Sequence, residues 1–597
     1  MTSEGSSQDF VRAGKLDELK RSGRLVVRGR HRPVLVVCDS GRIVALDNRC
    51  PHMGFPLDQG RIEDGILTCP WHHARFDVAS GCTFDLWADD VPTCPVALRD
   101  GEVWVRPTFS YVDPAGHWSR RLDDGMAHDL GLVIAKATAG LLAAGIAPAA
   151  ILRQAALFGA RNRDGWGVGL TILVALGNLL GQLSEEDVHL ALFHGCRRVA
   201  ADCDGEPPRR ERAPLASVPD LPTLKRWLRR WIAVRHRDGA ERTLSSAIAA
   251  GASPAALADM LLAAATDRLF ADGGHALDFT NKALECLDLI GWEHAGTILP
   301  TVVGQMAQAR GAEETSSWRQ PADLVTLTEK AIAELPALSA LARGIGSWRG
   351  HTALAHRLLG DDPSAIVAAL HDAVRAGAAP ADLGKALAYA AALRVARFGT
   401  ANEHGDWETA HHVFTYANAI HQGLARIATG EPDTLGHIEA VRGVFHGAVA
   451  LYLARYLNVP PARLPGEAGD RLDDLPTDPG ALKAALLDAF DRRHQVDAAG
   501  RLVARYLLLG HPAAGLIATL AHALLREDAG FHACQMLEAG VRQYRAWGEG
   551  EEGRHVLVAV ARYLAAHAPT ERTSYQTADI ARRLMRGARL HEEAEAG

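Results

Sequence analysis

Two different hydrophobic patterns divide the chain near residue 108. Before that point, short runs rich in β-branched residues alternate with turn residues such as Asp100-Gly101, which predicts short antiparallel strands. The clearest runs are RLVVRG, PVLVVCD, RIVALD and EVWVRP. From about residue 125 to about 587, apolar positions recur with helical spacing among many Ala and Leu residues. The pattern predicts a multidomain protein with a small all-β domain followed by a large all-α domain.

The helical part repeats a short break between apolar runs. The breaks are AAGIAP at 143–148, AAGASP at 249–254 and RAGAAP at 375–380. Gly readily ends a helix in the left-handed conformation, and Pro is favoured in the first turn of the next helix. Together with recurring Ala-Leu or Ala-Ile positions, the breaks predict about four duplicated helical units, at 129–203, 240–310, 365–458 and 482–570. These units are longer than solenoid repeats of about 20–50 residues, so we expect a duplicated helical bundle.

These patterns predict four parts of the chain. We expect an N-terminal domain at 1–108, a linker at 109–128, an all-α domain at 129–587 and a polar tail at 588–597.

Composition and charge narrow the function classes. A length of 597 residues exceeds what one core supports, and a net charge of −7 offers no basic surface to nucleic acid. The apolar run at 167–183 is too short for a membrane span and carries Asn178 and Gln182, so we expect a buried core helix. Nine cysteines, an odd number, argue against a disulfide scaffold. The polar start MTSEGSSQDF has no signal sequence. We therefore expect a cytoplasmic protein with no membrane partner.

The strongest chemical motif lies between residues 48 and 77. Cys50-x-His52 and Cys69-x-x-His72 are separated by sixteen residues. Two thiolates and two imidazoles can hold a single zinc ion, as in a zinc knuckle. One Cys and one His in each pair also suit a [2Fe-2S] cluster, in which both thiolates hold one iron and both imidazoles the other. His73 lies outside this pattern, and we expect it at the surface.

The motif resembles the Rieske family over residues 44–108. The resemblance implies that Cys50, His52, Cys69 and His72 bind a [2Fe-2S] cluster, and that residues 1–108 form a Rieske domain. Such a cluster transfers one electron and forms no bonds to substrate itself.

One difference from the respiratory Rieske proteins indicates which type of Rieske domain this chain resembles. Those proteins carry an extra Cys pair after the ligand clusters, where this chain has Phe55 and residues such as Ala74. The domain therefore resembles the ferredoxin or oxygenase type, and we expect a potential in the lower part of the Rieske range of about −150 to +300 mV.

The helical units each place a histidine among apolar neighbours. These are His194, His294, His446 and His532, in LALFHGC, GWEHAG, GVFHGA and GFHACQ. A histidine that faces a core is costly unless its nitrogens are satisfied. Equivalent positions in repeats can converge on a shared metal. Four separately hydrogen-bonded core histidines are the alternative.

The preceding helices add a second set of polar positions. Aligning the repeated triplets places Lys282, Asn418 and His522 at one position, and His275 and His411 at another. Lys282 lies on an apolar helix, where it either pairs with a carboxylate such as Asp278 or takes part in chemistry. The pairs His189/His194 and His351/His356 match the His-x4-His spacing of ring-hydroxylating oxygenases, but without the mixed α/β pattern around it.

The helical half also resembles the questin oxidase family, which acts on aromatic polyketides. The similar sequence segments are DRLFADGGHALDFTNKALECL, VFHGAVALYLARYL and EDAGFHACQMLEAGVRQY, within about 240–585. Related ring-cleaving dioxygenases hold a non-haem iron through four histidines and a carboxylated lysine. The resemblance implies His194, His294, His446 and His532 as the histidines and Lys282 as the lysine, with Lys282, His294 and His446 catalytic. Questin oxidases lack a Rieske domain.

Together these features predict a Rieske-dependent non-haem iron oxygenase. We expect electrons to pass from an external ferredoxin or NAD(P)H-dependent reductase, through the cluster, to a mononuclear Fe(II) that activates O₂. The substrate would be aromatic or polycyclic, and hydroxylated or oxidatively cleaved. A homo-oligomer would allow transfer between subunits. Aromatic residues near the predicted ligands would line a planar pocket, or are ordinary core residues: Trp166, Trp292, Trp407, Phe279 and Phe414.

Two other function classes stay open from the sequence. The first is an electron-transfer or redox-sensing protein with a metal-free helical docking scaffold. The second is a hydrolase whose helical half binds zinc or manganese.

Overall fold

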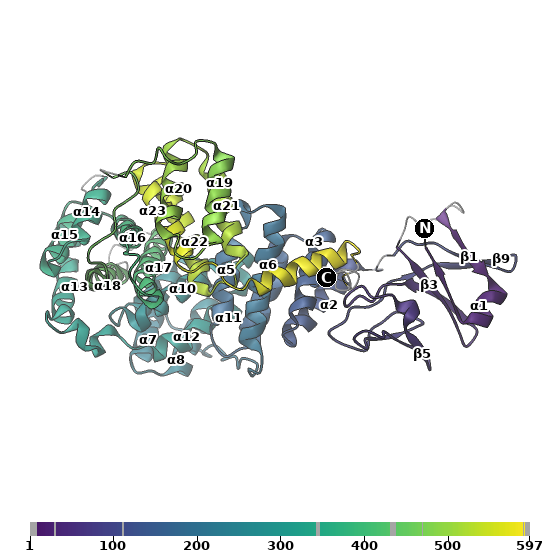
Figure 1. Ribbon diagram of the computed structural model, residues 1–597. Coiled ribbons are helices and arrows are strands. Elements are labelled where there is room, and N and C mark those ends of the chain that lie inside the picture. The colour runs from purple at the N-terminus through teal and green to yellow at the C-terminus, as the bar shows by residue number, and fades with distance from the viewer. Residues whose placement is uncertain are drawn as a thin grey trace. The chain divides into compact units, whose positions relative to one another are not determined.

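The computed structural model describes residues 9–28, 32–109, 111, 113–341, 347–429, 438–467, 470–588 and 590 (Figure 1). The chain forms two compact units. The first contains residues 1–151 together with 574–597, and the second contains residues 152–573. Most of the predicted tail, 589 and 591–597, lies outside the described residues.

The described strands form three antiparallel sheets between Val11 and Val105, drawn in purple in Figure 1. The first has the order β1 (Val11–Lys15), β10 (Glu102–Val105), β9 (Val96–Arg99). The second has the order β2 (Arg24–Val27), β3 (Val34–Asp39), β4 (Arg42–Asp47), β8 (Thr93–Cys94). The third has the order β5 (Arg61–Glu63), β6 (Ile66–Thr68), β7 (Arg75–Asp77). The predicted β domain is therefore confirmed.

Strand β3 separates two hydrophobic cores of the N-terminal domain. Val34 and Val36 pack into one core, and Leu35 and Val37 into the other. Successive side chains of a strand point to opposite faces, so a continuous apolar run buries both faces. The core on the side of Leu35 also contains Cys50 and Cys69, which places the two cysteine loops over a rigid apolar base.

Helices make up the remaining regular structure apart from short 3-10 turns. They are α1 (Leu16–Ser22), α2 (Pro114–Ala127), α3 (Gly131–Ala143), α4 (Pro148–Arg161), α5 (Val168–Leu179), α6 (Glu185–Cys203), α7 (Leu221–Ala233), α8 (Arg237–Ala249), α9 (Pro254–Ala265), α10 (His275–Ile290), α11 (Ala295–Ile298), α12 (Pro300–Gln308), α13 (Leu324–Leu341), α14 (His351–Leu358), α15 (Pro363–Arg375), α16 (Pro380–Ala396), α17 (His404–Ile427), α18 (Ile438–Ala454), α19 (Pro479–Phe490), α20 (Val496–Leu508), α21 (Ala513–Leu525), α22 (Phe531–Trp547), α23 (Glu551–Ala566) and α24 (Thr573–Met585). The predicted fold class, a β-sheet domain followed by a large helical domain, is confirmed. The fourfold duplication stays a prediction.

The three Gly-x-x-Pro breaks separate helices as expected. In each, the glycine has a positive φ just after one helix ends, and the next helix begins at the proline. The glycines are Gly145 (φ 79°), Gly251 (φ 77°) and Gly377 (φ 90°).

The segment expected as a linker, 109–128, contains helix α2. Trp118 is buried on α2, and a Cβ on Gly140 of α3 would lie 2.3 Å from the Trp118 ring. The close contact packs α2 directly against α3. Both helices belong to the first compact unit, so this unit extends past residue 108 to residue 151.

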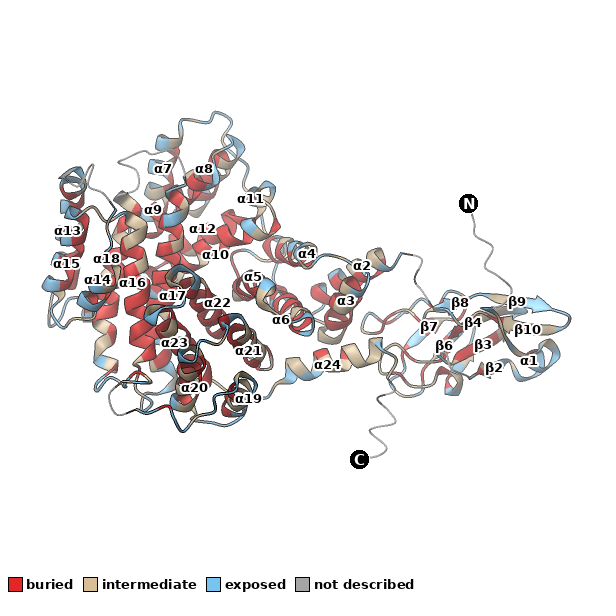
Figure 2. Cartoon of the chain, turned by 90° about the horizontal axis from the view of Figure 1, so that it is seen from above, coloured by how far each residue is buried: buried red, intermediate tan, exposed pale blue. Residues whose placement is uncertain are grey.

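The centre of the second unit is built from helices buried over most of their surface. Helices α5, α10, α16, α17, α22 and α23 are largely red in Figure 2, and neighbouring members of this set pack against one another. Helix α5 contains most of the apolar run predicted to be a core helix, and most of its residues are buried. Across the described part of the chain, the helices lack the length and apolar character that crossing a bilayer requires.

Candidate metal centres

The two cysteine loops share one backbone design. In each, the cysteine amide donates to the carbonyl five residues ahead, and its own carbonyl accepts from the amide four residues ahead. The bonds are Cys50 N to Phe55 O (2.8 Å), Gly54 N to Cys50 O (2.7 Å), Cys69 N to Ala74 O (2.9 Å) and His73 N to Cys69 O (3.0 Å). The matching turns present the two cysteines from equivalent positions, whereas His52 follows its cysteine by two residues and His72 follows its cysteine by three.

His73 occupies a backbone position that Gly54 fills in the other loop. Both have left-handed φ values, 62° for His73 and 82° for Gly54. The His73 side chain is exposed, as the sequence predicted. His73 therefore closes the second turn.

The side chains of these loops form two adjacent pairs. The thiols of Cys50 and Cys69 are hydrogen-bonded to each other, which raises the pKa of Cys50 and lowers that of Cys69 to about 6. The rings of His52 and His72 lie 4.8 Å apart between centroids, at 88°. His52 Nδ1 is buried without a hydrogen-bond partner in the described structure. Two thiols on one side and two imidazoles on the other match a [2Fe-2S] cluster.

A second group of ligand atoms lies in the helical domain. Among the described residues, one set of three or more His, Cys, Asp or Glu side chains has ligand atoms all within 4.8 Å: His275, His412 and His532. They come from the N-terminal part of α10, from α17 and from the start of α22. Nε2 of His412 and Nε2 of His532 are 3.0 Å apart. Two nitrogens about 2.1 Å from one ion, at a right angle, would be about 3.0 Å apart. We call these three residues the histidine triad.

Carboxylates hold the outer nitrogens of two triad histidines. His275 Nδ1 is 3.1 Å from Asp278 Oδ2, and His532 Nδ1 is 3.2 Å from Glu408 Oε1. A carboxylate in this place fixes the tautomer and turns the other ring nitrogen toward a metal. Nε2 of His532 is left facing His412, and the His275 ring lies 4.7 Å from the His412 ring between centroids.

Helix α10 begins at His275 after a strained turn. Phe270 (φ 39°), Asp272 (φ 53°), Gly273 (φ 62°) and Gly274 (φ 103°) all have left-handed backbone angles. A left-handed non-glycine residue costs about 1–3 kcal/mol and persists only where the surroundings enforce it. The Asp272 amide donates to Arg310 O at 2.8 Å, which anchors the turn. The turn aims His275 at the other two histidines.

His411 lies next to the triad. It is fully buried, and neither ring nitrogen has a hydrogen-bond partner in the part of the chain that the structure describes. Its ring centroid is 5.1 Å from that of His532 and 4.9 Å from that of Tyr563, on which it stacks at 29°. Burial, and then the neighbouring histidines, lower its pKa well below the usual value, so the ring is neutral.

The structure brings only His532 of the four predicted histidines into this group. His194 Nε2 is 2.9 Å from Leu525 O, an ordinary core hydrogen bond. His294 is partly exposed on a short 3-10 turn, with Nε2 3.7 Å from Glu293 Oε1. His446 is buried on α18, outside the triad. The structure therefore groups His532 with His275 and His412, and the binding of a metal by His194, His294 and His446 stays a prediction.

Lys282 also has a different place from the predicted one. It is buried on α10, and its Nζ donates to Glu285 Oε2 at 2.7 Å and to Glu538, rather than to Asp278. Burial disfavours the ammonium, but the two carboxylates outweigh it and raise the Lys282 pKa. A carboxylated lysine would set a third negative group beside these two. In the structure Lys282 is the cation of a buried ion-pair network, and its role as a metal ligand stays a prediction.

Two cavities border the triad on different sides. A cleft of about 490 Å³ reaches His412 and is lined by Phe270, Trp318, Val413, Leu453 and Arg310 among others. A pocket of about 180 Å³ reaches His532 and Glu408. The five aromatic residues expected to line a pocket do not border either cavity, although the Phe279 ring stacks on His275 at 5.0 Å.

Comparison with known proteins agrees with the geometry of the first centre. The Rieske [2Fe-2S] domain model matches residues 9–94. A human Rieske domain-containing protein is 35% identical over 92 residues, 14% of this chain and 59% of that protein. Aminopyrrolnitrin oxygenase PrnD of Pseudomonas fluorescens is 35% identical over 79 residues, 11% of this chain and 22% of that protein.

A solved structure covers the same part of the chain. The ferredoxin of carbazole 1,9a-dioxygenase from Nocardioides aromaticivorans IC177 is 30% identical, with a TM-score of 0.16, over 17% of this chain and 98% of that one. The chain spans less than two thirds of the length of the curated relatives it matches. The family model leaves the helical domain unassigned, so the resemblance to questin oxidases stays a prediction. Residues 9–94 are a Rieske [2Fe-2S] domain.

Proposed function

We propose that the protein is a Rieske-dependent non-haem iron oxygenase whose second metal is held by His275, His412 and His532. The observation that carries the proposal is the triad itself, with two of its outer nitrogens on carboxylates. Imidazole ligands suit iron, and three protein ligands leave coordination positions open. Iron there would supply a redox change and a binding position for O₂. The side chains Asp278 and Glu408 keep the ligating rings oriented.

The cleft beside His412 is the proposed substrate site. Its volume of about 490 Å³ lies within the range of about 300–1,000 Å³ for small-molecule sites. Phe270 and Trp318 form a stacked pair in it, 6.1 Å between centroids at 24°, which suits a flat aromatic molecule. Hydroxylation or oxidative cleavage of an aromatic or polycyclic substrate is the proposed reaction.

We propose an external ferredoxin or NAD(P)H-dependent reductase as the electron donor. The Rieske domain is similar both to a ferredoxin and to oxygenase subunits, which supports a role in a chain of one-electron transfers. Transfer within one chain and transfer between subunits of a homo-oligomer are both compatible with this role.

Iron content separates this proposal from its alternatives. An oxygenase of this kind holds about three irons per chain, whereas an electron carrier with a metal-free scaffold holds about two. Three imidazoles also suit zinc, so a hydrolase would show about two irons and one zinc ion.

The test combines metal analysis with electron paramagnetic resonance (EPR) of the dithionite-reduced protein. His412→Ala should lower the iron content from about three to about two per chain while the cluster signal persists. His446→Ala is the matched control, because His446 is a buried histidine of the neighbouring helix α18 that lies outside the triad. Two irons in the unaltered protein, or an unchanged content in His412→Ala, would refute the proposal.

A further inference from the structure

A buried lysine from outside the Rieske segment contacts the first cluster loop. Lys136 lies on α3, its side chain is 3% exposed, and its Nζ is 3.1 Å from Asp89 Oδ2. The same Nζ donates to the carbonyl oxygens of Pro51 and His52, at 3.4 Å for His52. We propose that Lys136 is a positioning residue that raises the reduction potential of the [2Fe-2S] cluster.

The two carbonyls that Lys136 contacts belong to the two peptide groups that follow Cys50 in its turn. The carbonyl of Pro51 and the amide of His52 form one peptide group, and the carbonyl of His52 and the amide of Met53 form the next. An ammonium on the carbonyl end polarises each peptide and makes the amide at its other end a stronger donor. Stronger donors beside the cluster sulfurs stabilise the reduced state.

The net positive charge of the buried side chains around Lys136 also acts to raise the reduction potential of the cluster. Arg121 of α2 donates from Nε to Asp89 Oδ1 at 3.1 Å, and from Nη2 to Leu86 O (2.6 Å) and Ala88 O (3.1 Å). Arg121 Nη1 also reaches Asp124, which is 43% exposed. Lys136, Arg121 and Asp89 are the buried members, two cations and one carboxylate. A net positive charge out of water favours a cluster that gains an electron.

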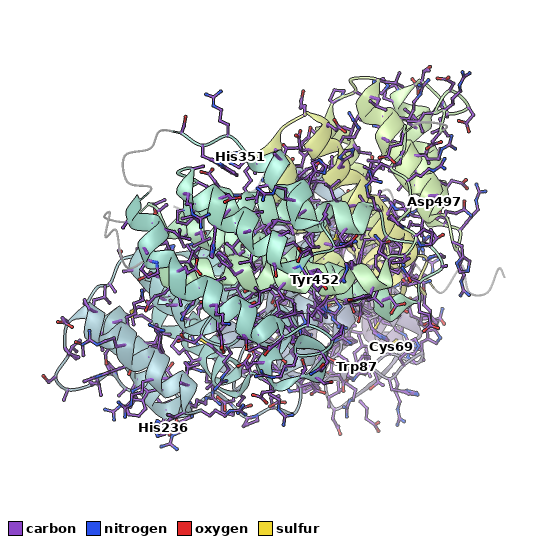
Figure 3. All side chains as sticks on the ribbon, turned by 90° about the vertical axis from the view of Figure 1, so that its left-hand side faces the viewer. Cys69, Trp87, His236, His351, Tyr452 and Asp497 are labelled. Atoms are coloured by element: carbon purple, nitrogen blue, oxygen red, sulfur yellow. The ribbon has the colours of Figure 1, made fainter. Side chains whose placement is uncertain are left out.

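The segment between Leu86 and Asp89 connects this group to the histidine ligands. Trp87 lies edge-on to the His52 ring, with centroids 4.8 Å apart at 76°. Trp87 and Cys69, both labelled in Figure 3, pack into the same buried cluster. Arg121 therefore fixes the segment that covers His52, and Lys136 fixes the loop that carries it. The helices α2 and α3 are thus part of the electron-transfer domain, beyond the segment 9–94 that the Rieske model matches.

Potentiometric titration of the full chain, followed by the EPR signal of the reduced cluster, tests the proposal. Lys136→Met should lower the equilibrium constant for cluster reduction about tenfold, which is 59 mV for one electron. Lys136→Gln, which keeps a donor without the charge, should lower it less. Lys20→Gln is the control, because Lys20 is an exposed lysine of the same domain on α1 and loses the same formal charge.

A variant that should raise the reduction potential separates a role of Lys136 in setting the potential from a purely structural role. Asp89→Asn removes the buried carboxylate but keeps its size, and should raise the potential. A structural defect would not shift the two variants in opposite directions. The proposal is overturned if Lys136→Met has the potential of Lys20→Gln, or if Asp89→Asn lowers the potential. Because it concerns only the cluster, this result is independent of the second metal.

Discussion

Replacing Asp278 with Asn tests whether the histidine triad binds a metal. Asp278 is 3% exposed, and its Oδ2 lies 3.1 Å from His275 Nδ1. The substitution keeps the size of the side chain but removes the charge that holds the Nδ1 proton and makes Nε2 a better donor. We therefore expect weaker metal binding without a change of fold.

The expected loss of metal affinity depends on the distance between the Asp278 carboxylate and the ion. Adding the 3.1 Å hydrogen bond, the width of an imidazole ring and a metal–nitrogen bond of about 2.1 Å places the carboxylate about 7 Å from the ion. A unit charge at about 7 Å from a divalent ion contributes about 5 kcal/mol at an effective dielectric constant of about 20. Loss of such outer partners typically lowers affinity about 10–100-fold, or about 1.4–2.8 kcal/mol. Because Asp278 is buried, we expect the value near 100-fold.

The assay is competition for Fe(II) against a chromophoric chelator under anaerobic conditions. The Rieske cluster serves as an internal standard, since its EPR signal should be the same in all variants. Asp288→Asn is the matched control, because Asp288 is on the same helix but is 42% exposed and paired with Arg426. If Asp278→Asn and Asp288→Asn retain iron equally, the triad is not a metal site.

Two further predictions concern side chains that the structure places outside both metal centres. His73→Gly should keep the cluster signal and, by relieving a left-handed φ of 62°, increase the unfolding free energy by about 1 kcal/mol; loss of the EPR signal would show instead that His73 is a ligand. Lys282→Met should lower the unfolding free energy, measured in urea, by about 3 kcal/mol, because Glu285 and Glu538 stay buried with Arg542 as their remaining cation. Loss of one iron from a stably folded Lys282→Met would restore Lys282 as a ligand.

The Rieske domain could be predicted from the sequence because its Cys-His motif is local. Both loops lie within 23 residues, Cys50 to His72, and each contains one complete ligand pair. The strands around the two cysteine loops could also be predicted from the hydrophobic pattern. A strand buried on both faces gives a continuous apolar run, and β3 shows this over Val34–Val37.

The histidine triad is harder to predict because its members come from three helices. The repeated triplets aligned His275 with His411, whereas His412 is the residue that lies beside His275 and His532. One residue on a helix is a rotation of about 100°, which turns a side chain from one neighbour to another. The hydrophobicity of the neighbouring residues also does not distinguish histidines of the triad from other core histidines, since His446 and His194 have neighbours as apolar as those of His532.

A carboxylate close to a histidine on the same helix is a better indication of a metal ligand than apolar neighbours are. His275 has Asp278 three residues ahead on its own helix, a spacing that lets the two side chains meet, and they do. His194 and His446 have no carboxylate three or four residues away on their helices. A core histidine needs one acceptor and finds it in a carbonyl, as His194 does at Leu525. A ligating histidine instead needs its outer nitrogen held so that the inner one faces the ion, and a carboxylate does this best. Histidines with such partners on converging helices are therefore better candidates for a metal site than histidines in apolar surroundings alone.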